Sequence, residues 1–468
     1  MKTIRFIGPE RPFSNIATGT KEECLEYCRS KAILGLDTET SGLDFTSKKL
    51  LMLQIGDAER QYVIDCRYVD LNFLLPVFEQ RPMFVLHNAK FDYKFLLNHG
   101  LRLDKVWDTM LAENVRYCGR NDKSASLAAT LERHFNIKLE KDERNQFIGM
   151  KGEPFTDKQI VYGAKDVVHL IRLKEVQQEK LDELQLISTI YLENRAVLAF
   201  ADIEYNGLDI DKEEWLKISK QSEVALVEIK EKLDRIVLED DVFKSVLPKY
   251  LQGDLFGDPD PVQILWSSPA QVKKVMQCIV LDIDDVNSKN LYFHRSKHAL
   301  IPIYIQYKEK SKLASSYGEE FLSNCLSDGR IHTSFKQILN TGRVSSKEPN
   351  MQQIPADNLF RNCFTAPEGW VFVSSDYSSQ ELNVIAYGSK DPVWLEALKK
   401  GQDLHSVCAH LVYGTKWEDA ASEGCDYFMP AQDITAAGVT VAVDIEKQKC
   451  NCPEHKKLRN NVKSINFG

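Results

Sequence analysis

The segment that most constrains this chain spans residues 341–391. It begins as a polar stretch, TGRVSSKEPNMQQIP, and after a spacer continues as FVSSDYSSQELNVIAYGSKD. The apolar residues 370–373 predict a β-strand, which Asp376 follows before a run with helical character. A carboxylate at the end of a buried strand is fixed by the sheet and open at its edge, so Asp376 is a candidate metal ligand.

The residues of these two motifs, and their order, resemble those of the family A DNA polymerases, of the DNA polymerase I type. In that family, TGR-x-SS-x-x-PN-x-Q-x-IP precedes the first catalytic motif of the palm domain, DYS-x-x-EL. The resemblance implies that Asp376 binds the two Mg²⁺ ions of nucleotidyl transfer and that the Tyr377 carbonyl assists. It also implies that Glu381 excludes ribonucleotides and that Arg343 contacts the minor groove at the primer end.

Three positions depart from the family pattern. Ser379 and Gln380 stand where the family has Gln-Ile, and Asn383 replaces the usual arginine. Asp376 and Glu381 nevertheless keep their spacing, so the contacts in doubt are those that the family makes through the replaced side chains.

Length and charge limit the possibilities less sharply. A chain of 468 residues should contain two to four domains, and 43% hydrophobic with 27% charged residues is typical of soluble globular proteins. A net charge of −8 excludes a globally basic nucleic-acid binder but not an enzyme with acidic metal sites beside local basic tracks. No run approaches a membrane span, and the 11 cysteines lack a disulfide framework. We therefore expect a cytoplasmic protein, in the nucleoid or in a phage-infected cell, with no membrane partner.

The N-terminal part, residues 1–185, predicts a nuclease. A short apolar strand runs into Asp37 and Glu39, which share one face because strand residues two apart point the same way. Further strands are expected at 50–55, 61–64 and 83–86, the last being followed by a helix that contains Asp92.

A later helix adds two more candidates to this set. Thr156 is expected to cap it, and Tyr162 and Asp166 then lie on one face at i and i+4. Together and in this order the motifs resemble the DEDD-type 3′–5′ exonucleases with a tyrosine in the third motif, which implies an RNase H-like fold. On that resemblance two divalent ions are bound by Asp37, Glu39, Asp92 and Asp166, Tyr162 positions the attacking water, and Asn88 meets the frayed strand.

Asp108, in the sequence WDTM, has two open interpretations. It matches an acid of the exonuclease family, but it could equally support the site from behind or cap a helix.

The overall prediction is an α/β and α+β multidomain chain. Helical spacing over 187–201, 212–238 and 271–278 predicts helices there. The family resemblance implies that these form a thumb and connector after the exonuclease. The expected domains are 1–185 (RNase H-like exonuclease), 186–340 (thumb and connecting helices), 341–404 (palm part with the first catalytic motif) and 405–468 (partial fingers).

A helix near the end of the sequence carries the candidates for nucleotide binding. Arg459, Lys463 and Phe467 are spaced by four and share one face. With His405, they resemble the triphosphate-binding fingers helix of the family. The resemblance implies that the cations neutralise dNTP phosphates while the ring stacks on the base.

Four possible zinc ligands lie between these motifs: Cys425, Cys450, Cys452 and His455. Their spacing is irregular and Cys425 is remote, so we predict that the thiols bind no metal, with zinc as the less favoured alternative. The expected cofactor is Mg²⁺ or Mn²⁺, two ions per site.

The given sequence reaches Gly468 within a helical run, and the family resemblance places the second palm motif, His-Asp-Glu, well over a hundred residues later. The sequence therefore leads us to expect a second polypeptide that completes the fingers and palm, as in a split polymerase of a phage, with DNA primer-template, single-stranded 3′ ends and dNTPs as the other partners. Two alternatives stay open. One is a stand-alone 3′–5′ exonuclease whose polymerase remnant grips primer-template, and the other is a non-catalytic DNA-binding subunit.

Overall fold

A computed structural model gives the fold of the chain in two compact units, Met1–Val371 and Phe372–Gly468. The residues that the structure describes are 3–10, 15–120, 122–138, 146–150, 152–247, 264–355, 358–377, 379–422, 425, 432–436, 439–443 and 452–466.

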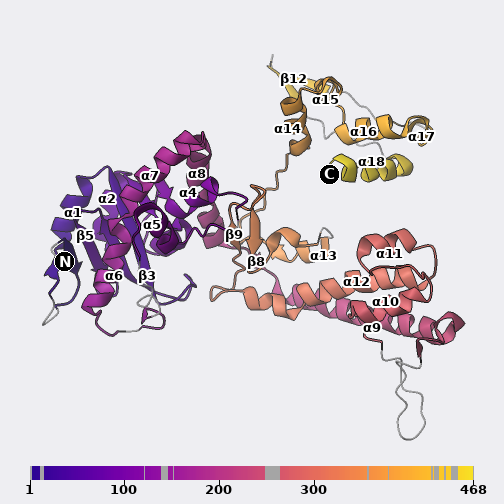
Figure 1. Cartoon of the computed structure of the whole chain (residues 1–468), viewed down its shortest axis with the longest axis horizontal. Coiled ribbons are helices and arrows are strands. Elements are labelled where there is room, and N and C mark those ends of the chain that lie inside the picture. Colours follow the sequence, from indigo (N-terminus) through magenta and orange to yellow (C-terminus); the bar gives the residue numbers. More distant parts are fainter. Residues whose placement is uncertain are drawn as a thin grey trace, which may run out of the picture. The chain divides into compact units, whose positions relative to one another are not determined.

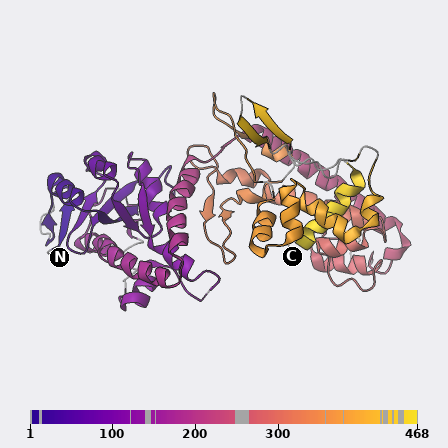
Figure 2. The same ribbon diagram turned by 90° about the horizontal axis from the view of Figure 1, so that it is seen from above.

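The first unit opens with a seven-stranded mixed sheet, which Figures 1 and 2 show in indigo to purple among its helices. The antiparallel strand β4 pairs with β3 and β5, while the outer pairs β1–β5, β1–β2, β3–β6 and β6–β7 are parallel. In spatial order the strands are β2 (Ala17–Thr18), β1 (Ile4–Ile7), β5 (Gln61–Asp65), β4 (Leu50–Gly56), β3 (Ile33–Thr40), β6 (Met83–Leu86) and β7 (Lys105–Asp108).

The four strands expected from the sequence are confirmed as β3 to β6, within one or two residues at each end except at the end of β3, which runs on through the acidic motif. The short strands β1, β2 and β7 were not predicted. The helices between and after these strands are α1 (Lys21–Arg29), α2 (Leu75–Glu79), α3 (Ala89–Leu97), α4 (Thr109–Arg116), α5 (Leu127–Phe135), α6 (Asp157–Val168) and α7 (Leu170–Glu183).

Two glycines allow α6 to lie close to the sheet. A Cβ on Gly35 of β3 would stand 2.8 Å from Cγ1 of Val167, and one on Gly163 of α6 would stand 2.5 Å from Nε2 of Gln54. Such distances are too short for any side chain larger than hydrogen. The helix that carries Tyr162 is therefore held against the strand that carries Asp37.

The remainder of the first unit is mainly helical, as predicted. The long helices α9 (Lys212–Glu239) and α12 (Leu300–Ser316) pack together with α10 (Pro269–Gln277) around a second core, while Trp215 stacks on Phe321 at 4.4 Å in a third. The other elements are α8 (Ile187–Asn206), β8 (Asp209–Ile210), α11 (Ser288–His294), β9 (Ser334–Lys336), β10 (Ser345–Lys347), α13 (Asn358–Arg361) and β11 (Phe364–Thr365).

Helix α8 belongs with the sheet rather than with the thumb-like helices that follow it. Its residues Ile190, Val197 and Ala201 are part of the core that the sheet forms with its helices. The expected domain boundaries at 185 and 340 fall inside the first unit and stay predictions.

The second unit consists of short helices and one hairpin. The helices are α14 (Gln380–Ser389), α15 (Pro392–Lys399), α16 (Leu404–Tyr413), α17 (Thr415–Glu418) and α18 (Pro453–Asn466), and the hairpin is β12 (Gln432–Ala436) with β13 (Val439–Val443).

The strand predicted at residues 370–373 is wrong. The chain is irregular from 370 to 377, and the four apolar side chains are 56–88% exposed. A strand forms only by pairing with a neighbouring strand. In the ladders of the described residues no strand pairs with this run, so an apolar sequence alone does not make it one.

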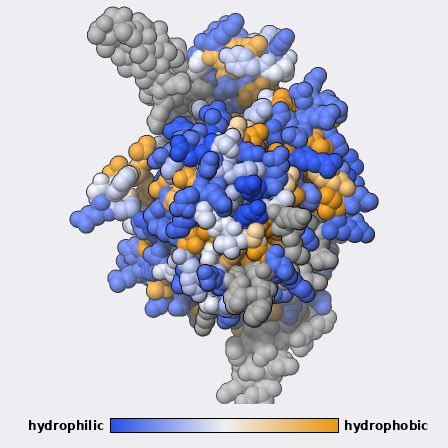
Figure 3. Space-filling view, turned by 90° about the vertical axis from the view of Figure 1, so that its left-hand side faces the viewer, coloured by the Kyte–Doolittle hydropathy of each residue, from blue (hydrophilic) through white to orange (hydrophobic). Residues whose placement is uncertain are grey.

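Two surface observations complete the description. The face of the first unit seen in Figure 3 is largely hydrophilic, with scattered hydrophobic residues. Among the described residues there is no helix with the length and apolar character needed to cross a membrane.

Candidate active site

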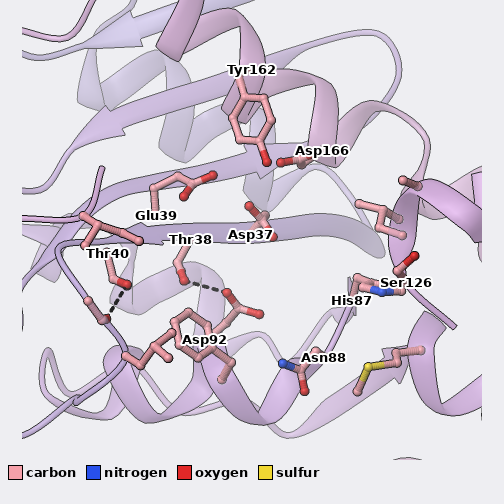
Figure 4. A pocket seen from close by; sticks show the side chains of 17 residues that line it. Asp37, Thr38, Glu39, Thr40, His87, Asn88, Asp92, Ser126, Tyr162 and Asp166 are labelled. Carbon is pink, nitrogen blue, oxygen red and sulfur yellow. Dashed lines mark hydrogen bonds between the residues drawn. The ribbon is translucent and has the colours of Figure 1, made fainter. Parts of the chain in front are cut away.

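A cavity of about 810 Å³ lies where β3, α3 and α6 meet in the first unit. Five of the predicted exonuclease residues line it together with Asn88 (Figure 4). The full lining is Asp37, Thr38, Glu39, Thr40, Gly42, Leu43, His87, Asn88, Phe91, Asp92, Met110, Ser126, Leu127, Ala128, Ile148, Tyr162 and Asp166.

Three carboxylates converge in this cavity. Ligand oxygens of Asp37, Glu39 and Asp166 all lie within 4.8 Å of one another. Hard oxygen ligands brought this close suit a divalent cation such as Mg²⁺, whose charge would relieve their mutual repulsion. The donor set therefore fits the metal that the exonuclease resemblance implies.

Local sequence explains how α6 presents its side chains. Thr156 caps the helix through a reciprocal capping box with Gln159, as the sequence predicted. The cap sets the start of the helix, so Tyr162 and Asp166 project from one face. In Figure 4 the Tyr162 hydroxyl points toward Asp166, above β3.

The fourth predicted ligand, Asp92, occupies a different position in the same cavity. It lies below β3 in Figure 4, and its Oδ1 accepts a hydrogen bond of 2.5 Å from the Thr38 hydroxyl. Burial raises the pKa of Asp92 to about 7 despite the Thr38 hydrogen bond, and the charge of Asp108 adds to the rise. Near neutral pH this carboxyl is thus partly protonated.

Asp108 is a helix cap. Its Oδ1 accepts hydrogen bonds from the backbone N–H groups of Met110 and Leu111 at the start of α4. The same carboxylate also accepts from the N–H groups of Asn88 and Ala89, at 3.1 and 2.8 Å. Asn88 has left-handed backbone angles, φ 71° and ψ 53°, which asparagine tolerates. One buried acid therefore joins the first turns of α3 and α4.

Replacing Asp108 by alanine should destabilise the first unit by about 3 kcal/mol, since a lost cap costs about 1 and each buried donor left without an acceptor costs about 1–3. Exonuclease activity should fall with it, because α3 carries Asn88 and Asp92. Denaturant unfolding compares the variant with Asp104→Ala, whose parent side chain is 46% exposed. Equal midpoints for the two variants would contradict this role.

Several cavity residues were not assigned from the sequence. His87 accompanies Asn88, and its Nδ1 lies 2.9 Å from the Thr109 hydroxyl. Leu43 and Ile148 are 77% and 65% exposed, so they are apolar side chains open to solvent at the cavity. For His87 and Leu43 the available signal was proximity in sequence to assigned residues, since His87 precedes Asn88 and Leu43 follows Glu39 by four residues. Ile148 has no assigned residue close to it in the sequence.

The TGR-x-SS segment forms a hairpin in the first unit. Arg343 is exposed in the connection between β9 and β10. The hydroxyl of Ser346 accepts hydrogen bonds from the N–H groups of Met351 and Gln352, and the Ser346 N–H donates to Oε1 of Gln352. Ser346 and Gln352 of the motif therefore stabilise the conformation of the loop that contains them.

The remaining polymerase candidates lie in the second unit. Asp376, Tyr377 and Glu381 are exposed, before and at the start of α14. Lys463 is half-buried on α18, and Phe467 lies outside the described residues.

Arg459 has a partner that the sequence did not reveal. Its Nε and Nη2 donate to the two carboxylate oxygens of Asp403, at 2.6 and 2.8 Å, and both side chains are buried. Asp403 is the N-cap of α16, on which the buried His405 stands. The ion pair therefore links α18, which carries Arg459, to α16, which carries His405. The charge of Arg459 is paired with that of Asp403.

Acid should weaken this packing. Burial alone would raise the pKa of Asp403, but the Arg459 and Ser406 hydrogen bonds outweigh it and lower the pKa to about 2. Because the pKa is lower in the folded state, the charged carboxylate stabilises the fold. This stabilisation is complete above the usual pKa of 3.8 and is lost as the pH falls toward 2. It amounts to about 2 kcal/mol. The protection of amides in α16 and α18, relative to the intrinsic exchange rate at each pH, should decrease over that range. Asp403→Asn should decrease it above the usual pKa, where the wild-type carboxylate is charged. An acid-insensitive wild type would contradict the assignment.

Comparisons with known proteins find relatives for both the N-terminal and the C-terminal part of the chain. Residues 17–182 match the family model for a 3′–5′ exonuclease, and residues 218–424 match that for DNA polymerase family A. DNA polymerase I of Borreliella burgdorferi is 28% identical over 423 residues, and that of Aquifex aeolicus is 29% identical over 434.

The alignments cover 84% and 86% of this chain, but 43% of the Borreliella and 68% of the Aquifex protein. The fold also resembles a solved structure, the POL domain of Pol1 from M. smegmatis in complex with DNA primer-template and dNTP. The TM-score is 0.68 at 20% identity, covering 99% of this chain and 70% of that one.

Proposed function

The chain belongs to the family A DNA polymerases and carries a 3′–5′ exonuclease domain, and on that premise we propose that it is a DNA polymerase that proofreads with its own exonuclease in replication or repair. The observation that carries the exonuclease half is the cluster of Asp37, Glu39 and Asp166 within 4.8 Å, in one cavity with Tyr162.

In this proposal the carboxylates hold divalent cations at the scissile phosphate. When bound, two Mg²⁺ or Mn²⁺ ions would supply the positive charge that stabilises the attacking and leaving oxygens. Tyr162 would orient the attacking water through its hydroxyl. Asp92 would release its proton before acting as a fourth ligand, since its pKa is raised to about 7.

The cavity also offers a place for unpaired bases. Leu43, Phe91 and Ile148 present apolar surface beside the acids, and bases stack readily on such surface. Asn88, held by Asp108, would donate or accept a hydrogen bond at the frayed end. A single strand is preferred because a paired base cannot reach these side chains.

For polymerisation we assign Asp376 as metal ligand, assisted by the Tyr377 carbonyl. Glu381 would exclude the 2′-hydroxyl of a ribonucleotide, because a fixed carboxylate leaves it neither room nor partner. Arg343 would contact the primer end in the minor groove.

The incoming dNTP would bind His405, Arg459, Lys463 and Phe467. Asp403 already neutralises Arg459 in the structure, so phosphates would compete with Asp403 for that guanidinium. The expected second polypeptide that completes the fingers and palm stays a prediction from the sequence.

Paired assays on the purified chain with Mg²⁺ test the proposal. One follows degradation of a single strand labelled at its 5′ end, and the other follows extension of a primer-template with dNTPs. Shortening from the 3′ end supports the exonuclease assignment. Extension by this chain, alone or with a completing chain, supports the polymerase assignment.

The outcomes separate the alternatives. Degradation with no extension under any pairing would favour a stand-alone exonuclease that grips primer-template. Binding of primer-template with neither activity would favour a non-catalytic subunit and overturn the proposal.

A further inference from the structure

We propose that Cys425, Cys452 and His455 form a structural zinc site beside the first turn of α18. The site lies wholly in the second unit and is separate from the carboxylate cavity of the first. Neither the exonuclease nor the polymerase assignments above make use of these residues.

The three side chains converge although the chain separates them. One ligand atom from each lies within 4.8 Å of the other two, and Cys425 Sγ is 3.4 Å from His455 Nδ1. In a tetrahedral site with zinc–sulfur bonds of about 2.3 Å and zinc–nitrogen bonds of about 2.0 Å, ligand atoms stand about 3.5–3.8 Å apart. The cluster is therefore close to the size that a bound zinc ion requires.

His455 is oriented as a metal-binding imidazole. Its Nε2 lies 2.6 Å from the backbone carbonyl of Trp417, so Nε2 carries the proton and donates it to that oxygen. The lone pair of the neutral ring is then on Nδ1, which faces Cys425. The indole of Trp417 stacks on the ring at 4.0 Å and fixes its plane. Most zinc-bound histidines likewise donate the N–H of the ring nitrogen that does not bind the metal to a carbonyl, a carboxylate or water.

Cys452 is surrounded by groups that favour a thiolate. The Ser422 hydroxyl lies 2.7 Å from its sulfur, and the Ser422 backbone N–H donates to it at 3.3 Å. Cys452 also directly precedes α18, and the partial positive charge at a helix N-terminus stabilises an adjacent thiolate. Zinc binds cysteine as the thiolate, so these contacts favour coordination.

The ligand chemistry identifies the ion and its role. Two thiolates and an imidazole are soft ligands that select zinc over the hard cations Mg²⁺ and Ca²⁺. The three side chains supply three of the four positions of a tetrahedral site, and a fourth ligand would complete it. Cys452 and His455 are buried and flank the start of a helix, which favours a structural role. The ion would tie the two ends of the segment that contains the β12–β13 hairpin and fix the start of α18.

This inference departs from the sequence prediction, which favoured thiols that bind no metal. The sequence separates Cys425 from Cys452 by 26 residues and so gives no recognisable zinc spacing. In the structure the two residues nevertheless lie together. Cys450, the other member of the set considered from the sequence, lies outside the described residues.

Metal content of the full chain provides the first test. After expression with zinc and dialysis against a weak chelator, we expect one equivalent of zinc per chain by plasma mass spectrometry. Cys425→Ser and His455→Ala should lose that equivalent. Three controls should keep it: Cys118→Ser, which changes an exposed thiol elsewhere; His410→Ala, which changes another histidine of the second unit; and Asp37→Ala, which removes a carboxylate ligand.

Cobalt substitution of the wild type provides a second test that needs no variant to fold. Tetrahedral Co²⁺ at this site should give intense visible ligand-field bands and a thiolate-to-cobalt charge-transfer band in the near ultraviolet. Absence of the charge-transfer band would overturn the proposal. So would equal zinc content in all variants, or an intact mass showing a Cys425–Cys452 disulfide in the purified chain.

Discussion

Replacing Asp37 by alanine is expected to lower the rate of 3′-end degradation on the order of 10³-fold. Loss of one group that stabilises charge at an active site typically costs about 10²–10³ in rate, and 10³-fold corresponds to about 4 kcal/mol. Asp37 should be at the upper end, because it is one of only three carboxylates that converge within 4.8 Å among the described residues. Polymerase extension, if present, should be unchanged.

The same variant should fold at least as well as the wild type without metal. Removing one of three converging carboxylates relieves repulsion, so the melting temperature in a chelator should be equal or higher. Added Mg²⁺ should raise the melting temperature of the wild type but not of Asp37→Ala, since ligand binding stabilises only a chain that can bind.

A matched control distinguishes the loss of a metal ligand from a general loss of negative charge. Asp104→Ala removes an exposed acid of the same unit and should keep both the activity and the Mg²⁺-dependent shift. Retention of full activity by Asp37→Ala would remove the carboxylate cluster from the mechanism.

Local patterns were enough to predict the acids and the tyrosine of this cavity. The period of two along β3 placed Asp37 beside Glu39, and the cap at Thr156 with helical spacing placed Tyr162 beside Asp166. Both relations depend only on residues close in sequence, and for that reason they survive folding. The strands β3 to β6 were predictable for the same reason.

Tertiary contacts account for what the sequence did not reveal. Asp92, one of the predicted ligands, accepts a hydrogen bond from Thr38, a contact that the fold alone creates. The pairing of Arg459 with Asp403 spans 56 residues. The run at 370–373 failed because a strand requires neighbours that the apolar pattern does not specify.

The segments around Glu204 show a contact of the same long-range kind. Glu204 of α8 is buried and accepts hydrogen bonds from Lys90, from Lys94 at 2.7 Å and from the backbone N–H of Phe335 at 2.7 Å. Lys90 and Lys94 belong to α3, which carries Asp92, and Phe335 belongs to β9, which leads to Arg343. One carboxylate therefore joins the exonuclease helix to the TGR hairpin.

Replacing Glu204 by glutamine should destabilise the first unit by about 3–5 kcal/mol, since removing one partner of a buried ion pair leaves uncompensated charge. Denaturant unfolding measures the loss. Glu179→Gln, an exposed acid of α7, is the matched control and should change stability by less than about 0.5 kcal/mol. Adding Lys90→Met to Glu204→Gln should recover part of the loss, because it removes the charge left without a counter-ion.

The pH dependence separates lost charge compensation from simple misfit. Burial lowers the pKa of Lys90 even in the wild type, where Glu204 opposes the shift. Without Glu204 the pKa should fall further, and a lysine with a lowered folded-state pKa penalises folding less as rising pH removes its proton. The stability difference between Glu204→Gln and the wild type should therefore narrow as the pH is raised from neutral toward 10. A difference that is constant over this range would mean that packing, rather than the buried charge of Lys90, explains the destabilisation.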